Sequence, residues 1–342
     1  MNDPSEIRPA INPIFVPLKI SDDEIEFRVG PFEGPKHTIK DSDREGTIGD
    51  LLEYFDGSHT VSEILAAFDP DQAEDVRTVI FAMLEKNALV DASERDPDAL
   101  WSYSTLSERI SEDERERLRT TTVGVVTRGR VGTMVASDLA ESGVESVRVH
   151  DLGGDQGDRI ESDPGLDSHD GSVEDLVSAV EYVLYADRSP GMAVARELNG
   201  HAVATGTPVT FGQVLGAEAV VGPTVLPERT PCLECLLERW KMHLPADTNY
   251  PAYAERAGDP GEVHLPAHSR LAAGLLAKEA TTQLLTGHGY VVGRTVDVEL
   301  LGMEFEANEV LRIPRCEVCG TTHDDWQRLI DPEVLRDRGE KR

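Results

Sequence analysis

The sequence lacks any apolar run approaching the roughly 20 residues that a membrane-spanning helix needs. Its opening residues, MNDPSEIRPA, lack the basic and apolar regions of a secretory signal. Cysteine is rare, with four in 342 residues, too few for a small scaffold built on disulfides. These absences predict a cytoplasmic protein with no membrane partner.

Positive charge is also scarce. The chain has 33 Lys and Arg residues against 64 Asp and Glu residues, a net charge of −31 spread along its length. Such a field repels nucleic acid and anionic lipid, so neither is an expected partner. Lysine is rare beside arginine, as in proteins from a high-salt cytoplasm, and we therefore expect a halophilic source. The charge then says little about function.

A chain of 342 residues can form two domains, each with its own core. Composition shifts predict four segments. They are a first domain at 1–93, a charge-rich helical linker at 94–119, a second domain at 120–330 and a C-terminal tail at 331–342.

The first domain is predicted to be a winged-helix-like α+β module. Alternating polar and apolar residues indicate three strands, at 11–20, 24–30 and 36–41. Thr60 and Glu63 form the pattern of a capping box at the start of one helix. Asp69 and Pro70 are typical of the N-cap and first turn of another helix, which would run over 71–86.

From residue 121 strands and helices alternate. Stretches such as TTVGVVT, ESVRVHD and EYVLYAD are each followed by a helical stretch. Alternation of this length predicts a doubly wound parallel sheet covered by helices, a Rossmann-like α/β domain.

The four cysteines form two C-x-x-C pairs, Cys232 with Cys235 and Cys316 with Cys319. Two such pairs can give one metal ion four sulfur ligands. We expect a structural zinc ion, because four sulfurs leave no open position for chemistry. A redox-active pair at a helix start is the alternative.

One turn, VVTRGRVGTMVA at 125–136, stands where a nucleotide-binding G-x-G-x-x-G would lie. Thr127 replaces its first glycine, while Gly129 and Gly132 keep the second and third positions. Asp151 ends the next strand, where an acid would bind ribose hydroxyls. Helix packing alone would also require Gly132, so the pattern is weak evidence for nucleotide binding.

Asp187 ends the third strand, at the edge where ligands bind in this fold class. The alternative is an N-cap for a helix that begins near Pro190.

These motifs, together with RVHD, YAD, CLEC and CEVC, resemble the ThiF/MoeB family of ubiquitin-activating-like adenylating enzymes over residues 120–323. The resemblance implies that Gly129, Gly132 and Asp151 correspond to residues that hold ATP. It also implies that Asp187 corresponds to the aspartate that assists magnesium–phosphate chemistry. A homodimer through this domain, as in relatives, is an open expectation.

The sequence departs from that family in its charge. Members carry a lysine and an arginine that neutralise the phosphates, whereas residues 152–180 contain only Arg159 among many carboxylates. Arginines of 107–120 are the alternative source of positive charge. We therefore expect that ATP is not a cofactor and that the domain has no catalytic residue; Asp187 would serve only in an active enzyme.

The stretch VGPTVLPERTPCLECLLERW is similar to one degenerate branch, the cyclodehydratase-domain proteins of thiazole/oxazole-modified peptide (TOMM) and bacteriocin biosynthesis. In that branch the ThiF-like domain docks to a YcaO-type enzyme that cyclises Cys, Ser or Thr of a precursor peptide. The resemblance implies the same partner here.

The first domain resembles the PqqD-like recognition element over residues 11–92. Such elements bind a leader peptide as an added strand beside their third strand and against their third helix. A winged helix that binds DNA is the alternative, which the acidic third helix disfavours. The residues expected to contact the leader are His37, Thr38, Ile39, Lys40, Val76, Val79 and Met83.

The sequence therefore predicts a non-catalytic subunit that presents a precursor peptide to a YcaO-type cyclodehydratase. A working adenylating enzyme and a stand-alone peptide sensor are the alternatives.

Overall fold

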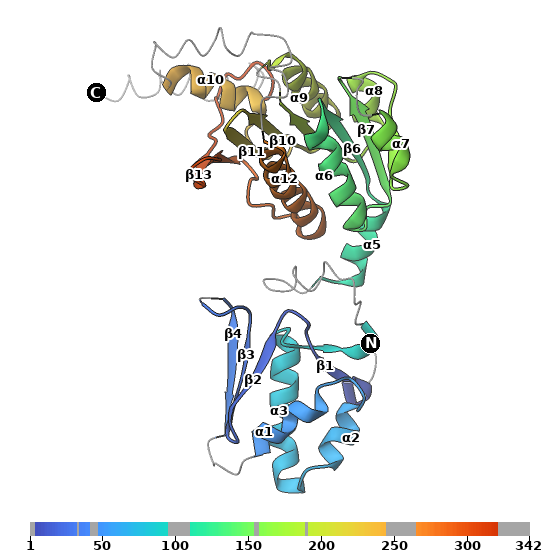
Figure 1. The fold of residues 1–342 in the computed structure, drawn as a ribbon, viewed down its shortest axis with the longest axis vertical. Coiled ribbons are helices and arrows are strands. Elements are labelled where there is room, and N and C mark those ends of the chain that lie inside the picture. The colour runs from blue at the N-terminus through green and yellow to red at the C-terminus, as the bar shows by residue number, and fades with distance from the viewer. Residues whose placement is uncertain are drawn as a thin grey trace, which may run out of the picture. The chain divides into compact units, whose positions relative to one another are not determined.

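The computed structural model describes residues 4–32, 34–41, 47–94, 110–153, 157–188, 191–243 and 265–320. The chain forms two compact units, residues 1–111 and 112–342, shown in blue to cyan and in green to red in Figure 1. The predicted tail at 331–342 and most of the predicted linker lie outside the described residues.

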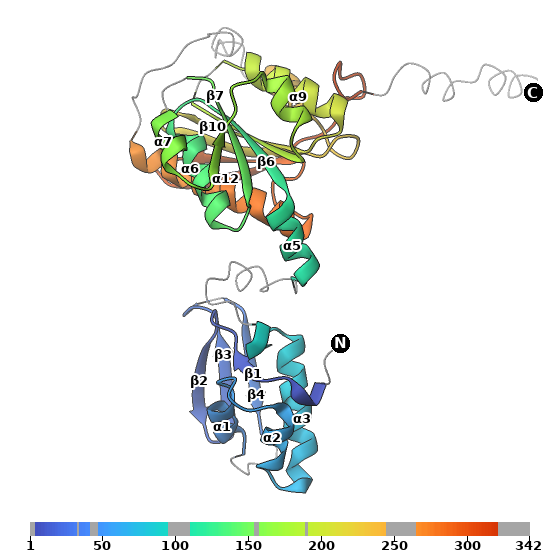
Figure 2. The same cartoon turned by 90° about the vertical axis from the view of Figure 1, so that its right-hand side faces the viewer.

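The first unit is an α+β module built on a three-stranded antiparallel sheet of order β2-β3-β4. Its elements, which Figure 2 shows from a second side, are η1 (Pro4–Glu6), β1 (Pro9–Ile11), β2 (Val16–Ser21), β3 (Glu24–Arg28), β4 (Lys36–Lys40), α1 (Thr47–Leu51), η2 (Leu52–Tyr54), α2 (Val61–Ala66), α3 (Pro70–Glu85), β5 (Leu89–Asp91) and η3 (Ala92–Glu94).

Local sequence signals explain these elements. On β3, Ile25 and Phe27 alternate with half-buried polar residues and are completely buried, as expected for a strand with one face on a core. At α2 the predicted capping box is present, since the Thr60 side chain accepts from the Glu63 N–H and the Glu63 carboxylate accepts from the Thr60 N–H. Helix α3 begins at Pro70 after Asp69, as predicted.

One pairing was not predicted. β1 pairs antiparallel with β5, and Ala10 lies opposite Val90. Both strands have three residues and lie 80 positions apart in sequence, so neither carries a periodic signal.

The second unit is a doubly wound α/β domain, as predicted. Its eight-stranded sheet has the order β13-β12-β11-β10-β9-β6-β7-β8. The five strands from β10 to β8 are parallel, and β11, β12 and β13 add antiparallel pairs at one edge.

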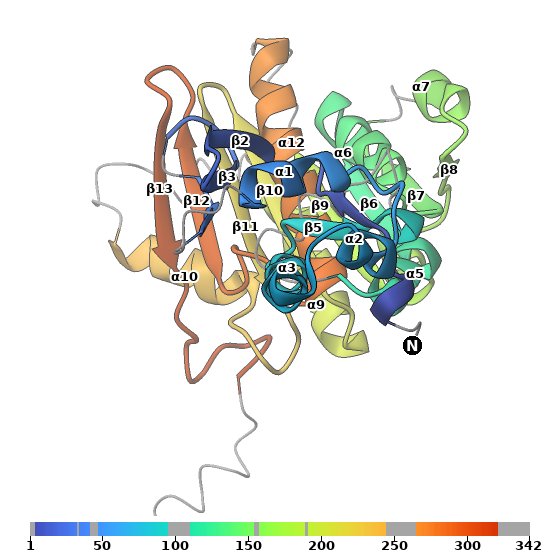
Figure 3. The ribbon, with the colours of Figure 1, turned by 90° about the horizontal axis from the view of Figure 1, so that it is seen from below.

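Helices cover both faces of this sheet. α6 and α12 pack on one face, and α8, α9 and α10 share a core cluster on the other. Figure 3, seen from below, shows α12 and α6 beside the strands. The elements are α5 (Glu112–Thr120), β6 (Thr122–Thr127), α6 (Arg130–Glu141), β7 (Ser146–Asp151), α7 (Gly157–Ser162), β8 (Leu166–Ser168), α8 (Val173–Ser178), β9 (Tyr182–Asp187), α9 (Ala193–Thr205), β10 (Val209–Leu215), β11 (Glu218–Val225), α10 (Leu233–His243), α12 (Pro266–Thr286), β12 (Arg294–Glu299) and β13 (Glu304–Glu309).

Helix α5 covers the end of the predicted linker, yet it packs on α12. Arg117 donates from Nη2 to the Leu285 carbonyl at 3.0 Å, and Leu118 is buried. This helix therefore belongs to the second unit, while the other predicted domain limits stay predictions. Within the described residues, no helix combines the length and the hydropathy of a membrane span.

The capping box of α2 gives a test of the first unit. Thr60→Ala removes the hydroxyl that accepts from the Glu63 N–H at 3.2 Å, and we expect the free energy of unfolding to fall by about 1 kcal/mol. Chemical denaturation followed by circular dichroism measures it. Thr78→Ala, on an exposed site within α3, is the control and should leave stability almost unchanged. Equal stability of the two variants would contradict the assigned cap.

Candidate functional site: the glycine turn, its arginines and the four thiols

The turn between β6 and α6 needs glycine at one position. Gly129 is the N-cap of α6 and has φ +79°, in the region that residues with a Cβ rarely adopt. β6 ends at Thr127 and the helix begins at Arg130, so three residues complete the change of direction.

Thr127 fills the space inside this turn. Its side chain is completely buried, its hydroxyl donates to the Ala186 carbonyl at 2.7 Å, and it accepts from the Gly132 N–H at 3.1 Å. A Cβ at Gly132 would overlap the Thr127 side chain. Gly132 is therefore required for packing against Thr127, and an N–H at the start of α6 is already satisfied by protein.

Arg188 lies on the other side of the turn. It follows β9, is 7% exposed, and its Nε would lie 3.0 Å from a Cβ at Gly129. Close beside it, Arg128 places Nε 3.7 Å from the Asp187 carboxylate. Arg128 and Arg188 of this same chain therefore place positive charge beside the turn.

This finding corrects the expectation that the rim lacks cations. The expectation considered residues 152–180, where the side chain of Arg159 lies outside the described part of the structure. The signal was the pair of arginines around Gly129 in TRGR, with Arg188 after YAD, because strands that are parallel neighbours bring their ends together.

Asp187 is an internal acceptor at the end of β9. Only 1% of its surface is exposed, and it accepts from the Tyr185 hydroxyl at 2.6 Å and from the Arg188 N–H at 2.7 Å. Burial, and then the carboxylate, raise the pKa of Tyr185 well above its usual value. α9 begins at Ala193 after the N-cap Met192, so Asp187 is not the N-cap considered as its alternative role.

Asp151 ends β7 directly beside Thr127 in the sheet. It is half-buried, and its carboxylate accepts from the Gly153 N–H at 3.0 Å. The structure therefore brings Gly129, Gly132, Asp151 and Asp187 to the same edge of one sheet, as the order of the strands predicted.

The four cysteines come together although 81 positions separate Cys235 from Cys316. Their sulfur atoms all lie within 4.8 Å of one another. Cys232 Sγ lies 3.6 Å from Cys316 Sγ, and Cys235 Sγ lies 3.5 Å from Cys319 Sγ. A tetrahedron with Zn–S bonds of about 2.3 Å has sulfurs about 3.8 Å apart, so this donor set fits one such metal ion.

The electrostatics of the cluster also favour a cation. Hydrogen bonds among the crowded thiols raise the pKa of Cys232 and lower that of Cys235. Four sulfurs this close cannot all ionise unless a cation compensates their charge. The Ile313 N–H also points to Cys235 Sγ at 3.4 Å, a neighbouring donor that orients the sulfur.

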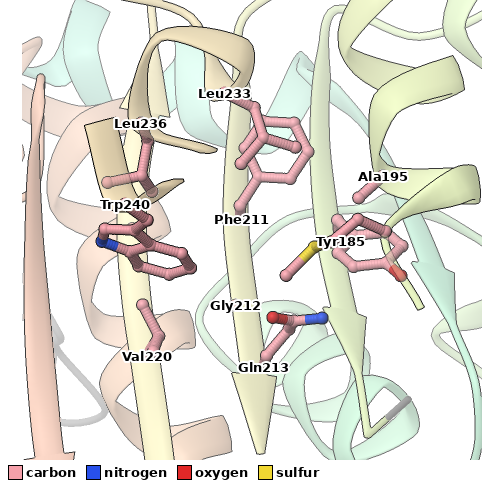
Figure 4. Close-up of a pocket in the computed structure, with 11 residues that line it drawn as sticks. Tyr185, Ala195, Phe211, Gly212, Gln213, Val220, Leu233, Leu236 and Trp240 are labelled. Atoms are coloured by element: carbon pink, nitrogen blue, oxygen red, sulfur yellow. The ribbon is translucent and has the colours of Figure 1, made fainter. Parts of the chain in front are cut away.

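A small cavity lies between α10 and the strands β9, β10 and β11 (Figure 4). It is lined by Tyr185, Phe211, Leu233, Leu236 and Trp240 among others, and its volume is about 20 Å³. That volume holds about one water molecule, so the cavity is no nucleotide pocket. Leu233 and Leu236 are the sequence neighbours of Cys232 and Cys235 and share a core cluster with Tyr185, so α10 packs against β9, the strand that carries Asp187.

In the first unit, β4 carries four of the residues expected to contact peptide. β4 pairs with β3 and forms an edge of its sheet. Thr38 and Lys40 are exposed, His37 is half-buried and Ile39 is buried.

The predicted contacts on α3 differ in exposure. Val76 and Met83 are 3% and 4% exposed and belong to the core cluster. Their role is to hold α3 in place, while half-buried Val79 can also be reached from solvent. Burial of Val76 and Met83 arises because the helix uses its i, i+4 and i+7 positions against the sheet.

Known structures share this fold. A heterocyclase in complex with substrate and cofactor has a TM-score of 0.64 at 16% identity, over 97% of this chain and 40% of that one. The heterocyclase TruD has a TM-score of 0.64 at 18% identity, over 97% of this chain and 44% of the TruD chain. E. coli MccB, in a structure with MccA, has a TM-score of 0.65 at 14% identity, over 92% of this chain and 99% of the MccB chain.

This chain thus spans less than half the length of the two heterocyclases. The expected ThiF-like fold is confirmed by this similarity. No protein-family model matches the sequence, and no curated protein matches it.

The packing between Thr127 and Gly132 gives a second prediction. Gly132→Ala should destabilise the second unit by about 2 to 3 kcal/mol, because the added methyl overlaps Thr127. Thr127→Gly/Gly132→Ala should be more stable than the sum of the single changes predicts, by about 1 kcal/mol or more. Denaturant unfolding of all four proteins measures the coupling, and strictly additive effects would contradict the described turn.

Proposed function

We propose that this chain is a leader-peptide-binding and docking subunit that presents a ribosomal precursor peptide to a YcaO-type, azoline-forming cyclodehydratase in TOMM or bacteriocin-like biosynthesis. The observation that carries this proposal is the combination, in one chain, of an open strand edge at β4 with a nucleotide turn already filled by its own side chains.

The edge of β4 supports peptide capture. An extended peptide can pair with an edge strand through main-chain hydrogen bonds, and its alternate side chains then contact neighbouring surfaces. Exposed Thr38 and Lys40 lie on one face of β4, and half-buried His37 lies on the other with Val79 of α3 in the same module. Affinity would come from the backbone and selectivity from these side chains.

The filled turn supports a scaffold without adenylating activity. A triphosphate at a helix start uses free N–H groups and close backbone approach. Here Thr127 takes the Gly132 N–H, and Arg188 covers Gly129. Binding a nucleotide would require both side chains to move, a cost that an active adenylating enzyme does not bear.

We propose that the four thiols hold one zinc ion. Cys232 and Cys235 come from the start of α10, and Cys316 and Cys319 follow β13. Zinc bound by four sulfurs has no open position, so it would supply cross-linking and no reaction chemistry. It would fix the last described segment of the chain against α10.

The heterocyclases with this fold are longer chains, of which this one covers 40% and 44%. We propose a YcaO-type catalyst as the docking partner because the stretch around Cys232 and Cys235 resembles the TOMM branch, in which the ThiF-like domain docks to such an enzyme. A homodimer through the second unit remains part of this proposal, to be tested by light scattering.

The peptide-binding role can be measured directly. The probe is a synthetic leader from a short Cys-, Ser- or Thr-rich reading frame beside a neighbouring YcaO-type gene. We expect it to bind and to slow hydrogen–deuterium exchange in residues 36–40, because main-chain pairing protects the edge. ATP with magnesium should give no binding and no pyrophosphate exchange.

Either of two results would overturn this function: no protection of 36–40 at saturating leader, or pyrophosphate exchange at a rate that Asp187→Ala abolishes in a folded protein. The absence of both gene types nearby would favour a stand-alone peptide sensor instead.

An adenylating enzyme is the second candidate, and one observation favours it. Arg128, Arg130 and Arg188 surround the turn, which gives this edge cations that could stabilise phosphate charge. MccB, solved with ATP, shares the fold. Arg188→Ala distinguishes the two: it should abolish exchange in an enzyme, but only change stability in a scaffold.

Zinc content is the fourth prediction. We expect one zinc per chain by elemental analysis. Cys316→Ser should lose it and raise proteolysis after residue 309, since removing one ligand weakens a structural site strongly. Ser162→Ala, away from the cluster, should keep full zinc. Retention of stoichiometric zinc by Cys316→Ser would contradict the assigned ligand set.

A further inference from the structure

Lysine is unevenly distributed in this chain. Its seven lysines are Lys19, Lys36, Lys40, Lys86, Lys241, Lys278 and Lys341. Two of them, Lys36 and Lys40, are the first and last residues of the five-residue strand β4. A third, Lys86, caps the C-terminal end of α3.

The register of the sheet shows which of these charges are neutralised. Lys40 lies opposite Glu24 on β3 and places Nζ 3.1 Å from its carboxylate. Lys36 lies opposite Arg28, which is paired with Glu26 at 2.9 Å. Both Lys36 and Lys86 are exposed, and neither forms an ion pair with any residue in the described part of the chain.

Lys36 begins β4, and a chain of contacts links the C-terminal end of α3, with Lys86, to the inner face of this strand. The Asn87 carbonyl accepts from Asn12 Nδ2 at 2.9 Å, and the Asn12 carbonyl accepts from the Phe15 N–H at 2.9 Å. Lys36 shares the outer face of the sheet with Arg28, since paired residues of antiparallel strands point the same way. His37 points to the inner face, against Phe15, with ring centroids 5.5 Å apart. These contacts place Lys86 on the inner side, and after burial its charge is the second cause that lowers the pKa of His37.

We propose that the segment captured at β4 is acidic: it places at least one carboxylate beside the start of β4, between Lys36 and Lys86, and turns apolar residues inward toward α3. This rests on the proposed peptide-binding function and names the chemistry of its substrate.

Charge complementarity supports an acidic occupant over a neutral one. The net charge is −31 and α3 itself carries Asp71, Glu74, Asp75 and Glu85, so most of the chain repels an acidic peptide. Lys36 and Lys86 form no ion pair with any described residue, so they mark the place where a carboxylate can approach. A strand paired with β4 sends alternate side chains to the two faces. A carboxylate on the outer face would therefore lie near Lys36, and one on the inner face would lie near Lys86.

Salt limits how far this selectivity extends. At 1 M salt the screening length is about 3 Å, so only a carboxylate in direct contact with a lysine is still attracted. Main-chain hydrogen bonds are not screened in this way. We therefore expect affinity to persist at high salt while the preference for acidic peptides shrinks.

The experiment uses the full chain and a display library of random 12-residue peptides, selected in low and in molar KCl. An enriched sequence is then synthesised with its Glu and Asp residues and again with Gln and Asn. Fluorescence anisotropy compares both peptides on wild type, on Lys36→Glu/Lys86→Glu, and on Lys241→Glu, a control on α10 in the second unit.

We expect enrichment of Asp and Glu at low salt. The neutral peptide should bind about fivefold more weakly to wild type, and the double variant should lose about tenfold for the acidic peptide. Lys241→Glu should bind like wild type. Both losses should shrink in molar KCl.

The possible results distinguish a failure of the acidic-peptide inference from a failure of the proposed peptide binding. Peptides that bind and protect residues 36–40 equally well with or without acidic residues would overturn the inference and leave peptide capture intact. A library that yields no peptide protecting β4 at either salt concentration would overturn peptide capture itself.

Discussion

The second unit depends on one buried hydroxyl. Thr127 stands between Asp151 and Ala186 in the sheet, and its side chain joins the Ala186 carbonyl on β9 to the Gly132 N–H on α6. A buried polar group must find partners, and here it finds one on each side of the turn. The space inside the bend is therefore filled by a side chain of the protein itself.

The cysteine cluster is connected to the same sheet through α10. Cys232 and Cys235 lie at the start of α10, whose Leu233 and Leu236 pack with Tyr185 in one core cluster. Tyr185 in turn donates to Asp187 at the rim. A metal ion bound by the four thiols would cross-link α10 to the segment after β13 and so help to hold the face of the sheet that carries Asp187.

Structural features that a few neighbouring residues encode were predicted from the sequence. The capping box of Thr60 and Glu63, Pro70 at the start of α3, the alternation on β3 and the spacing of the cysteines each encode a local geometry. The approach of the two distant cysteine pairs was also predicted, because one metal site needs all four sulfurs. Other contacts between distant segments were not predicted. The pairing of β1 with β5 has too few residues to show a period, and Arg188 reaches the turn only because β9 and β6 are neighbours in the folded sheet. Periodicity identifies elements, but neighbour relations set which charges meet.

The proposed peptide capture in the first unit would combine two interactions of different range. Main-chain pairing with β4 would be short-ranged and insensitive to salt, so it would supply affinity in any solvent. Charge is longer-ranged but screened, so Lys36 and Lys86 would select among peptides only at contact distance in concentrated salt. A chain with a net charge of −31 cannot attract an acidic segment by its overall field. The proposed recognition would then rest on single cations such as Lys36 and Lys86, which form no ion pair with any residue that the structure describes.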